Sequence, residues 1–307
     1  MKRAVITGCT GALGRALAEE LVRENWQVIA VPRENSGRIS AVPKEEGIKI
    51  VPCNLERMEE LPERCKEPAD VFFHLAWDGT YGRDREDCAR QNRNVEYTLQ
   101  AVTAAKKMGC SVFVGAGSQS EYGRVEGVLQ PGTVCRPDSP YGAAKLSACH
   151  MSRILCSRLG IRQEWCRILS LYGPCDGEYT MIMSIIRSFL KGEKPACTKG
   201  EQVWDYLYSK DAARALRLAA EKGKDGAVYC LGSGESRLLR EYITAVRDAA
   251  APGLSIGFGE RPYHPDQVMC LRADLSDLQR DTGFRVSYSF EEGIAETVRW
   301  CKENGYR

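Results

Sequence analysis

Short apolar runs alternate with helical patterns along most of the chain. Residues 2–7 form an apolar run that ends at glycine, after which Leu13, Leu17 and Leu21 repeat at helical spacing. This pattern predicts a strand, a tight turn and a helix. Similar runs predict strands over 26–31, 48–51, 70–77, 111–116 and 163–171. Because the run over 70–77 is apolar almost throughout, we expect a parallel sheet that is covered on both faces.

Helical periodicity predicts the elements that connect and follow these strands. Val95, Leu99 and Val102 repeat within 90–108, and Ser139-Pro140 indicates another helix start, because proline needs no N–H partner at the first helical position. The later part of the chain predicts helices over 180–191, 209–221, 237–250 and 290–304 and a strand over 200–207.

Together these elements predict an α/β fold, a doubly wound parallel sheet (Rossmann) with a smaller α/β substrate lobe at its C-terminal side. We expect the sheet domain to contain residues 1–172 and 201–231, and the lobe to contain residues 173–200 and 232–307.

The composition is typical of a globular enzyme. Of 307 residues, 43% are hydrophobic and 27% are charged, and the net charge of +2 argues against a nucleic-acid surface. No apolar segment approaches transmembrane length, and the first residues lack the apolar run of a signal peptide. The fourteen cysteines are scattered without a Cys-x-x-Cys pair, and with only three histidines they fit neither a disulfide scaffold nor a zinc site. We expect a cytoplasmic protein with no metal, nucleic-acid partner or membrane contact.

A glycine-rich turn follows the first predicted strand. Glycines spaced by three let the backbone approach a pyrophosphate, and the following helix directs the positive end of its dipole at that charge. The residues predicted to bind a dinucleotide are Gly8, Thr10, Gly11, Ala12, Leu13 and Gly14.

The end of the second predicted strand bears on the choice of cofactor. A carboxylate there usually meets the free ribose 2′-OH of NAD, but the sequence has a proline followed by Arg33. Arg33, or with less reason Arg38, would face a 2′-phosphate, which favours NADP(H). NAD(H) stays an alternative because Glu34 is adjacent. Asn54 and Leu55, after the third strand, are predicted contacts of the adenine side.

Tyr141 and Lys145 form the candidate proton-transfer pair. Because they are four residues apart on a predicted helix, they share one face. A free tyrosine has a pKa of ~10, and a nearby ammonium favours the phenolate and brings that proton within working range. Ser118 follows the strand over 111–116, at the sheet edge where open α/β folds bind ligands. Trp77 ends the strand over 70–77, and it either covers the nicotinamide or substrate or packs in the core.

In this order, the motifs resemble those of the extended short-chain dehydrogenase/reductase family, in its nucleotide-sugar epimerase/dehydratase/reductase branch. The resemblance runs nearly from end to end, and the order of the motifs is more specific than any single motif. It is carried by Thr7 through Gly14, His74-Leu75-Ala76, Asn94-Val95, Ser118 through Gly123, Ser139 through Lys145, Arg167 through Pro174, Gln202 through Asp211 and Asp274 through Lys302.

The resemblance implies roles for particular residues. Tyr141 would be the general acid/base, Lys145 would bind the nicotinamide ribose and lower the tyrosine pKa, and Ser118 would hydrogen-bond the same substrate oxygen. Asn94 would hold the helix geometry or a proton-relay water. Arg261 would grip the pyrophosphate of a nucleotide-diphosphate sugar. The implied cofactor contacts also include Leu75, Ala76 and Leu171, and the implied substrate contacts are Trp77, Ser118, Ser120, Tyr141, Trp204 and Arg261. A homodimer through 90–108 and 141–159 is implied as well.

Departures from the family pattern narrow the function. The 4,6-dehydratases have Asp-Glu directly after the serine or threonine, because elimination of water needs a second acid and base, but here Gln119 and Ser120 follow Ser118. Glu121 comes one residue too late, and on an extended stretch its side chain would point to the opposite side. Elsewhere, a phosphate-contacting arginine is replaced by Trp204, and an asparagine common in 4-epimerases is replaced by Ser170.

These observations favour an NADP(H)-dependent reductase that delivers hydride to the C4 ketone of a 6-deoxy nucleotide-diphosphate sugar, with Tyr141 as acid/base. The alternative is an NAD-dependent nucleotide-sugar 4-epimerase, which uses the same residues twice. A non-catalytic dinucleotide-sensing protein is a more remote alternative, since it has no need of Ser118, Tyr141 and Lys145 together.

Overall fold

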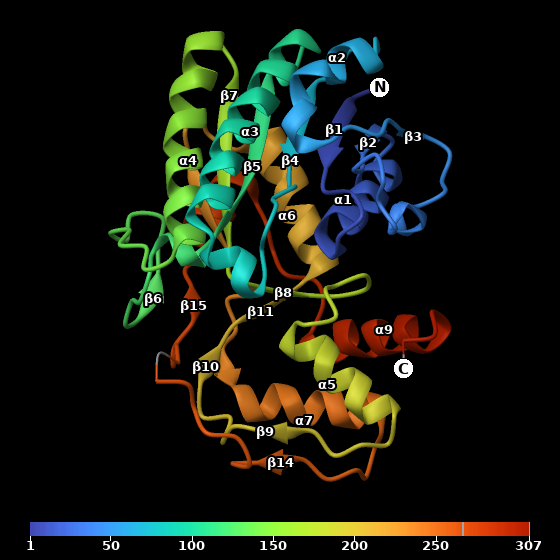
Figure 1. Ribbon diagram of the computed structural model, residues 1–307, viewed down its shortest axis with the longest axis vertical. Coiled ribbons are helices and arrows are strands. Elements are labelled where there is room, and N and C mark those ends of the chain that lie inside the picture. The colour runs from blue at the N-terminus through green and yellow to red at the C-terminus, as the bar shows by residue number, and fades with distance from the viewer. Residues whose placement is uncertain (266, 307) are drawn as a thin grey trace.

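The structure, a computed structural model, describes residues 1–265 and 267–306. Its central sheet has seven parallel strands and lies in the upper half of Figure 1. The strands are β1 (Arg3–Thr7), β2 (Gln27–Val31), β3 (Ile48–Ile50), β4 (Val71–His74), β5 (Val112–Ser118), β7 (Arg162–Ile168) and β12 (Val228–Leu231). They lie in the order β12-β7-β5-β4-β1-β2-β3. Because the chain order reverses beside β1, the carboxyl ends of β1 and β4 border the crevice where such sheets bind ligands.

Helices cover both faces of the sheet. They are α1 (Ala12–Arg23), α3 (Cys88–Lys107), α4 (Pro140–Leu159) and α6 (Ser209–Lys222). Successive residues of a strand point to opposite faces, so Ile6 packs with α1 and α6 whereas Val5 packs with α3. The predicted doubly wound parallel sheet is therefore confirmed.

A smaller α/β part lies below the sheet in Figure 1. Its helices are α5 (Met181–Leu190), α7 (Leu239–Ala250) and α9 (Phe290–Glu303), and its short strands are β9 (Ala196–Cys197), β10 (Val203–Trp204), β13 (Arg237–Leu238) and β14 (Gly257–Phe258). Phe189, Tyr242 and Phe290 belong to its separate hydrophobic core. The remaining short elements are α2 (Leu61–Arg64), α8 (Ser276–Thr282), the pair β8 (Ser170–Tyr172) and β11 (Tyr206–Tyr208), and the pair β6 (Val128–Leu129) and β15 (Arg272–Ala273). The smaller lobe was expected, and the exact residue ranges of the two domains stay a prediction.

Some predicted boundaries were wrong. The strand over 70–77 ends at His74, because the next two backbone N–H groups turn to the hydroxyl of Thr7. The strand over 200–207 is interrupted at Asp205, whose carboxylate accepts from the backbone N–H of Ser233 at 2.6 Å. The helix over 237–250 begins at Leu239, because the two residues before it pair with β10.

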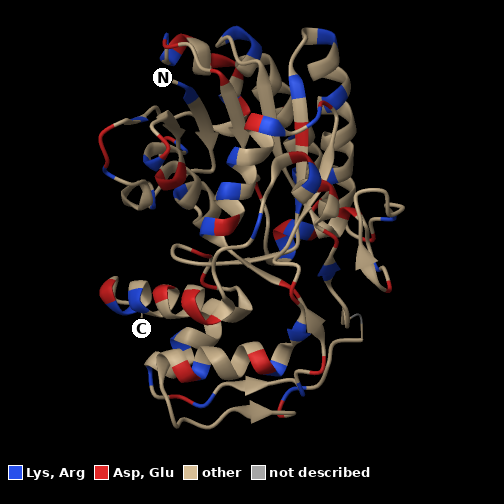
Figure 2. Cartoon of the chain, turned by 180° about the vertical axis from the view of Figure 1, so that it is seen from behind, with Lys and Arg blue, Asp and Glu red and all other residues tan. Residues whose placement is uncertain are grey.

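Charges of both signs are interspersed over the molecule (Figure 2). All fourteen cysteines are free. Within residues 1–265 and 267–306, no helix is long and apolar enough to cross a membrane, and no group of three or more His, Cys, Asp or Glu side chains is arranged to hold a metal ion.

Candidate active site

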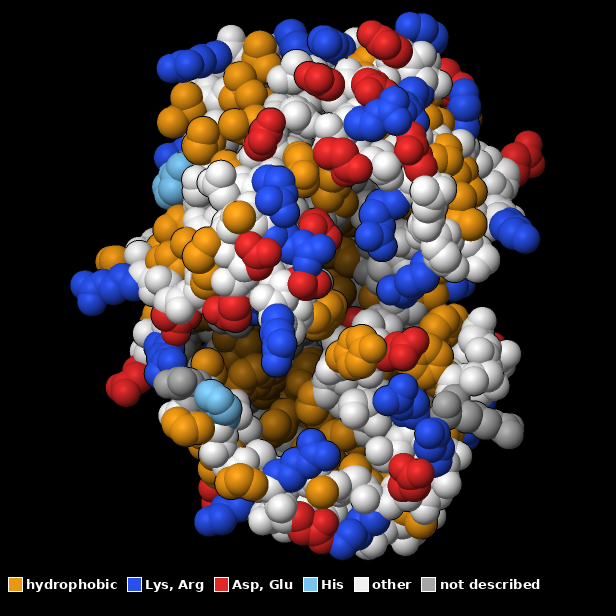
Figure 3. All heavy atoms as spheres, in the orientation of Figure 1, with side chains coloured by type: hydrophobic (Ala, Val, Ile, Leu, Met, Phe, Trp, Pro, Cys, Tyr) orange, Lys and Arg blue, Asp and Glu red, His pale blue; other side chains and the backbone are white. Residues whose placement is uncertain are grey.

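A cleft of about 790 Å³ lies between the sheet and the smaller part of the molecule. Figure 3 shows a hollow between the two parts with hydrophobic side chains in its depth. The structure brings most of the predicted site residues to this cleft: Gly8, Thr10, Gly11, Ala12, Leu13, Gly14, Arg33, Leu55, Leu75, Ala76, Trp77, Ser118, Tyr141, Lys145, Leu171 and Trp204. Four others, Asn54, Asn94, Ser120 and Arg261, do not line it.

The glycine loop has the shape that a dinucleotide requires. A Cβ added to Gly14 would lie 2.2 Å from the carbonyl oxygen of Gly8, and one added to Gly8 would lie 2.8 Å from the backbone nitrogen of Ala76. Gly11 caps α1 without a side chain, so the first N–H groups of this helix face the cleft. The loop therefore fits a bound pyrophosphate, which it would hold through backbone N–H groups.

At the adenosine end of the cleft, Arg33 and Arg38 line the wall and Glu34 does not. The side chain of Asn54 was expected on the adenine side, but it binds Glu34 instead. Its Oδ1 accepts from the backbone N–H of Glu34 at 3.0 Å, and its Nδ2 donates to the Glu34 carboxylate at 3.1 Å. Glu34 is therefore paired with Asn54 and does not line the cleft.

Tyr141 and Lys145 lie on the first turns of α4. The helix begins as predicted, with Ser139 accepting from the backbone N–H of Gly142 at 3.2 Å and Pro140 in the first turn. Lys145 Nζ donates to the carbonyl of Ala116 at 2.6 Å. Burial lowers the pKa of Lys145 to about 7, and the Glu121 carboxylate opposes this shift.

The pKa of Tyr141 is raised rather than lowered. Burial is the main cause, and the guanidinium of Arg85 and the hydroxyl of Ser118 oppose it. The expectation that Lys145 lowers this pKa was therefore wrong for this structure, because its ammonium is directed at Ala116. Sequence reasoning missed Arg85, although an arginine in the loop after the carboxyl end of a strand was a signal that could have been used.

Glu121 supports Ser118 from outside the cleft. The residues 119–121 form a 3-10 turn, and this turn takes the Glu121 carboxylate into the protein. The Glu121 carboxylate accepts hydrogen bonds from the backbone N–H of Ser118 at 2.8 Å, from Trp165 Nε1 at 2.9 Å and from Arg167 Nε at 2.7 Å. Glu121 does not line the cleft, although the stretch forms a 3-10 turn rather than the extended segment that was expected. Ser120 was an expected substrate contact, but its hydroxyl accepts from Arg85 and Gln119 instead.

The remaining predicted site residues are Asn94, Arg261 and Trp204. Asn94 is buried, and its amide binds both the backbone N–H and the carbonyl of Asp78, at 2.8 and 2.9 Å. It therefore holds the loop between β4 and α3. Arg261 is exposed after β14 and does not reach the cleft, so this structure does not give it the expected pyrophosphate contact. Trp204 Nε1 donates to the hydroxyl of Ser170 at 2.8 Å at the cleft wall.

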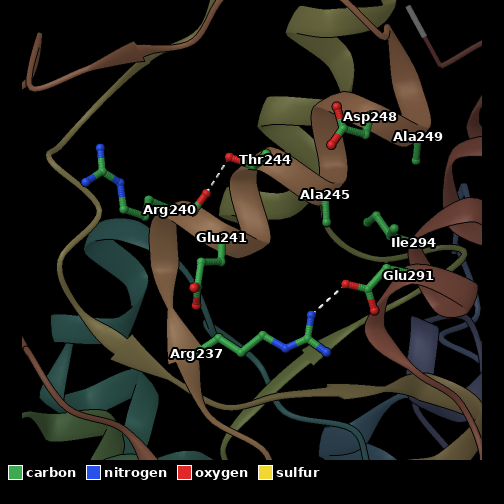
Figure 4. A pocket seen from close by; sticks show the side chains of 9 residues that line it. All are labelled: Arg237, Arg240, Glu241, Thr244, Ala245, Asp248, Ala249, Glu291 and Ile294. Carbon is green, nitrogen blue, oxygen red and sulfur yellow. Dashed lines mark hydrogen bonds and ion pairs between the residues drawn. The ribbon is translucent and has the colours of Figure 1, made fainter.

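A second groove lies between α7 and α9 (Figure 4). Arg237 pairs there with Glu291 at 2.6 Å and with Glu235 at 2.9 Å. Glu241 accepts from the backbone N–H of Leu238 and so caps α7. None of the predicted site residues lines this groove, so the first cleft is the candidate active site.

Comparisons with known proteins show the family and the fold of this chain. Residues 4–232 match the model of the NAD dependent epimerase/dehydratase family. The chain is 29% identical over 206 residues to a dTDP-glucose 4,6-dehydratase of Xanthomonas campestris pv. campestris, a match that covers 62% of this chain and only 58% of that enzyme. The UDP-glucose 4-epimerase of Thermotoga maritima has the same fold, with a TM-score of 0.87 and 23% identity over 99% of both chains. MoeE5, solved with UDP-glucuronic acid and NAD, is 25% identical with a TM-score of 0.84 over 99% of this chain and 100% of that one. The chain belongs to the NAD-dependent epimerase/dehydratase family.

Proposed function

We propose that this chain is a nucleotide-sugar 4-epimerase that works with a retained nicotinamide cofactor. The observation that supports this most is that Ser118, Tyr141 and Lys145 line the same cleft as the glycine loop. The Thermotoga protein is described as a 4-epimerase, and MoeE5 is described with a UDP-sugar and NAD. These relatives favour the epimerase, which the sequence offered as the alternative, over the reductase.

One acid/base residue is sufficient for this reaction. When bound, the cofactor supplies hydride acceptance and return at C4. Burial raises the pKa of Tyr141, but the guanidinium of Arg85 opposes this shift and the positive charge of an oxidised nicotinamide would oppose it further. As the phenolate that these charges favour, Tyr141 accepts the proton of the C4 hydroxyl and afterwards returns a proton to the same oxygen. Ser118 hydrogen-bonds that oxygen and positions it, while Lys145 would hold the nicotinamide ribose. Because the proton leaves and returns at one oxygen, no acidic pair is needed after Ser118.

The carboxylates of the cleft are already engaged, which argues against dehydration. Asp78 and Asp84 both pair with Arg90, Asp78 at 2.8 Å. Asp176 accepts from the hydroxyl of Thr180 at 3.0 Å. In the described part of the chain, no further carboxylate lines the cleft, so a second acid and base for elimination is not supplied.

An NADP(H)-dependent reductase is the second candidate, and Arg33 is the observation that favours it. Its exposed side chain lines the cleft, whereas Glu34 is held by Asn54. If the cofactor carries a 2′-phosphate, Arg33→Ala should weaken NADP binding roughly 10- to 100-fold while leaving NAD binding unchanged. Equal weakening of both dinucleotides would remove this support.

A direct experiment separates the two candidates. The cofactor that co-purifies with the protein is identified, and the protein is then incubated with UDP-glucose or UDP-glucuronic acid while NMR follows inversion at C4. Inversion without net consumption of cofactor is the expected result. Oxidation of added NADPH by a 4-keto-6-deoxy nucleotide sugar, without inversion of either UDP-sugar, would show the reductase instead.

A homodimer through α3 and α4 is also part of the proposal. Met151 and Ile154 on α4 are large hydrophobic side chains that remain exposed in the single chain, at 45% and 52%. Sedimentation velocity of the protein, compared with a variant that carries Met151→Glu and Ile154→Glu, tests this expectation.

A further inference from the structure

Arg85 is a cation in the cleft that forms no ion pair with any carboxylate of the described residues. It lies in the 3-10 turn Gly82–Glu86, between β4 and α3, and its side chain is half-buried at the cleft wall. The adjacent carboxylate of Asp84 pairs with Arg90. No carboxylate within residues 1–265 and 267–306 forms an ion pair with Arg85.

The guanidinium of Arg85 is held beside the reacting centre. Its central carbon lies 4.3 Å from the centre of the Tyr141 ring, and one of its nitrogens donates to the hydroxyl of Ser120. One edge of the planar group is thereby fixed, and the remaining donors are available to a ligand in the cleft.

The chemistry at Tyr141 limits which group can meet Arg85. In the proposed function Tyr141 acts at the C4 hydroxyl, so a group that reaches Arg85 belongs to a carbon close to C4. In a hexopyranose the pyrophosphate is attached to C1, across the ring from C4, whereas C5 and its C6 substituent are adjacent. In a hexose without an added acidic substituent at O3, the anionic group beside C4 is a C6 carboxylate, which matches the paired donors of a guanidinium.

We propose that Arg85 binds the C6 carboxylate of the sugar, so that the preferred substrate is a nucleotide-diphosphate hexuronate rather than a neutral hexose. This inference rests on the proposed function, because it takes Tyr141 to act at C4. With a neutral hydroxymethyl group at C6, the guanidinium would have only the phenolate of Tyr141 beside it, and that negative charge is lost when Tyr141 takes up the C4 proton.

The test compares UDP-glucuronic acid with UDP-glucose in the wild type, in Arg85→Gln and in Arg85→Lys. The wild type should favour the uronate in kcat/KM, and Arg85→Gln should reduce that preference on the order of 100-fold. The readout is the ratio of the kcat/KM values for the two sugars. Because Arg85 also faces Tyr141, its loss should slow turnover of both sugars, and the ratio removes this common effect. Arg85→Lys keeps the charge but not the planar pair of donors, so its preference for the uronate in kcat/KM should fall about tenfold. Arg83→Gln, at an exposed neighbour outside the cleft, is the control and should keep the ratio.

Binding of UDP alone and of the dinucleotide, measured for each variant by calorimetry, distinguishes the outcomes and reports folding. If the wild type turns over both sugars equally, or if the ratio survives in both Arg85 variants, this inference fails and the epimerase stands. If the Arg85 variants bind UDP-glucuronic acid, UDP-glucose and UDP all more weakly by the same factor, the guanidinium contacts the pyrophosphate instead. That result would also overturn this inference. If neither sugar is bound or inverted by the wild type, the proposed function itself fails.

Discussion

The ammonium nitrogen of Lys145 lies 5.9 Å from the centre of the Tyr141 ring but only 3.8 Å from the centre of the Trp77 ring. Its hydrogen bond goes to the carbonyl of Ala116, two residues before the end of β5. A carbonyl and an aromatic face both favour the charged ammonium, yet burial dominates and lowers the pKa to about 7. Lys145 therefore titrates near neutral pH when the cofactor is absent.

The titration of Lys145 predicts how stability depends on pH. An unfolded lysine has a pKa of ~10.4, so between about pH 7 and pH 10 the unfolded chain binds a proton that the folded protein has released. The contribution of Lys145 to stability therefore rises with pH in this window and is lost as the pH falls through about 7. Lys145→Met removes it. Urea unfolding without cofactor is measured at about pH 7 and pH 9 for both proteins. From the lower to the higher pH, the free energy of unfolding of the wild type should rise relative to that of the variant. A difference that stays constant would contradict the lowered pKa.

Tyr141→Phe should reduce kcat roughly a thousandfold while the dinucleotide still binds, because only the hydroxyl that moves the proton is removed. Steady-state kinetics with a nucleotide sugar and a titration with dinucleotide measure the two effects. Tyr122→Phe is the matched control, since the Tyr122 hydroxyl is buried against Cys230 at 3.1 Å and lies outside the cleft. Full activity of Tyr141→Phe would remove the mechanism.

Two glycines of the loop should respond differently to alanine. A Cβ on Gly14 would lie 2.2 Å from the carbonyl oxygen of Gly8, so Gly14→Ala must displace the loop and should abolish dinucleotide binding. A Cβ on Gly11 meets that oxygen only at 3.6 Å, so Gly11→Ala should fold with near-normal stability. Thermal unfolding and dinucleotide titration of both variants check this. The prediction fails if Gly14→Ala binds the cofactor as tightly as the wild type.

The buried pair of Glu121 and Arg167 should be a strong structural contact. Their side chains are 0% and 4% exposed, so Glu121→Gln leaves a buried cation without its partner and should cost about 3–5 kcal/mol. Asp138→Asn, in the exposed pair with Arg124, is the control and should cost less than about 1 kcal/mol. Urea denaturation measures both. A small effect for Glu121→Gln would show that the buried charge is compensated elsewhere.

Local signals in the sequence predicted the parts of the site that depend on local structure. The glycine loop and the spacing of Tyr141 and Lys145 are set by a turn and by helix periodicity, and these residues line the cleft. Asn54 and Arg261 were predicted from their position in the chain, but their surroundings depend on distant residues. Asn54 binds Glu34 across two loops, and Arg261 follows a strand of the smaller part of the molecule.

The same limit explains what the sequence did not predict. The seventh strand of the sheet, β12, is only four residues long and is recognised by its pairing with β7 rather than by its own pattern. Arg85 lies in a loop without periodicity, and only the folded chain shows that it stacks on Tyr141. Tertiary contact, rather than local propensity, decides both features.

The most direct test of the account follows a hydrogen label at C4. UDP-glucuronic acid carrying deuterium at C4 is incubated with the purified protein in ordinary water, and NMR records both epimers. If hydride leaves and returns within one active site while Tyr141 carries the proton of the oxygen, deuterium stays at C4 in substrate and product, with no net change in cofactor. Inversion with loss of the label to solvent would contradict this account, and so would the absence of inversion together with consumption of added cofactor.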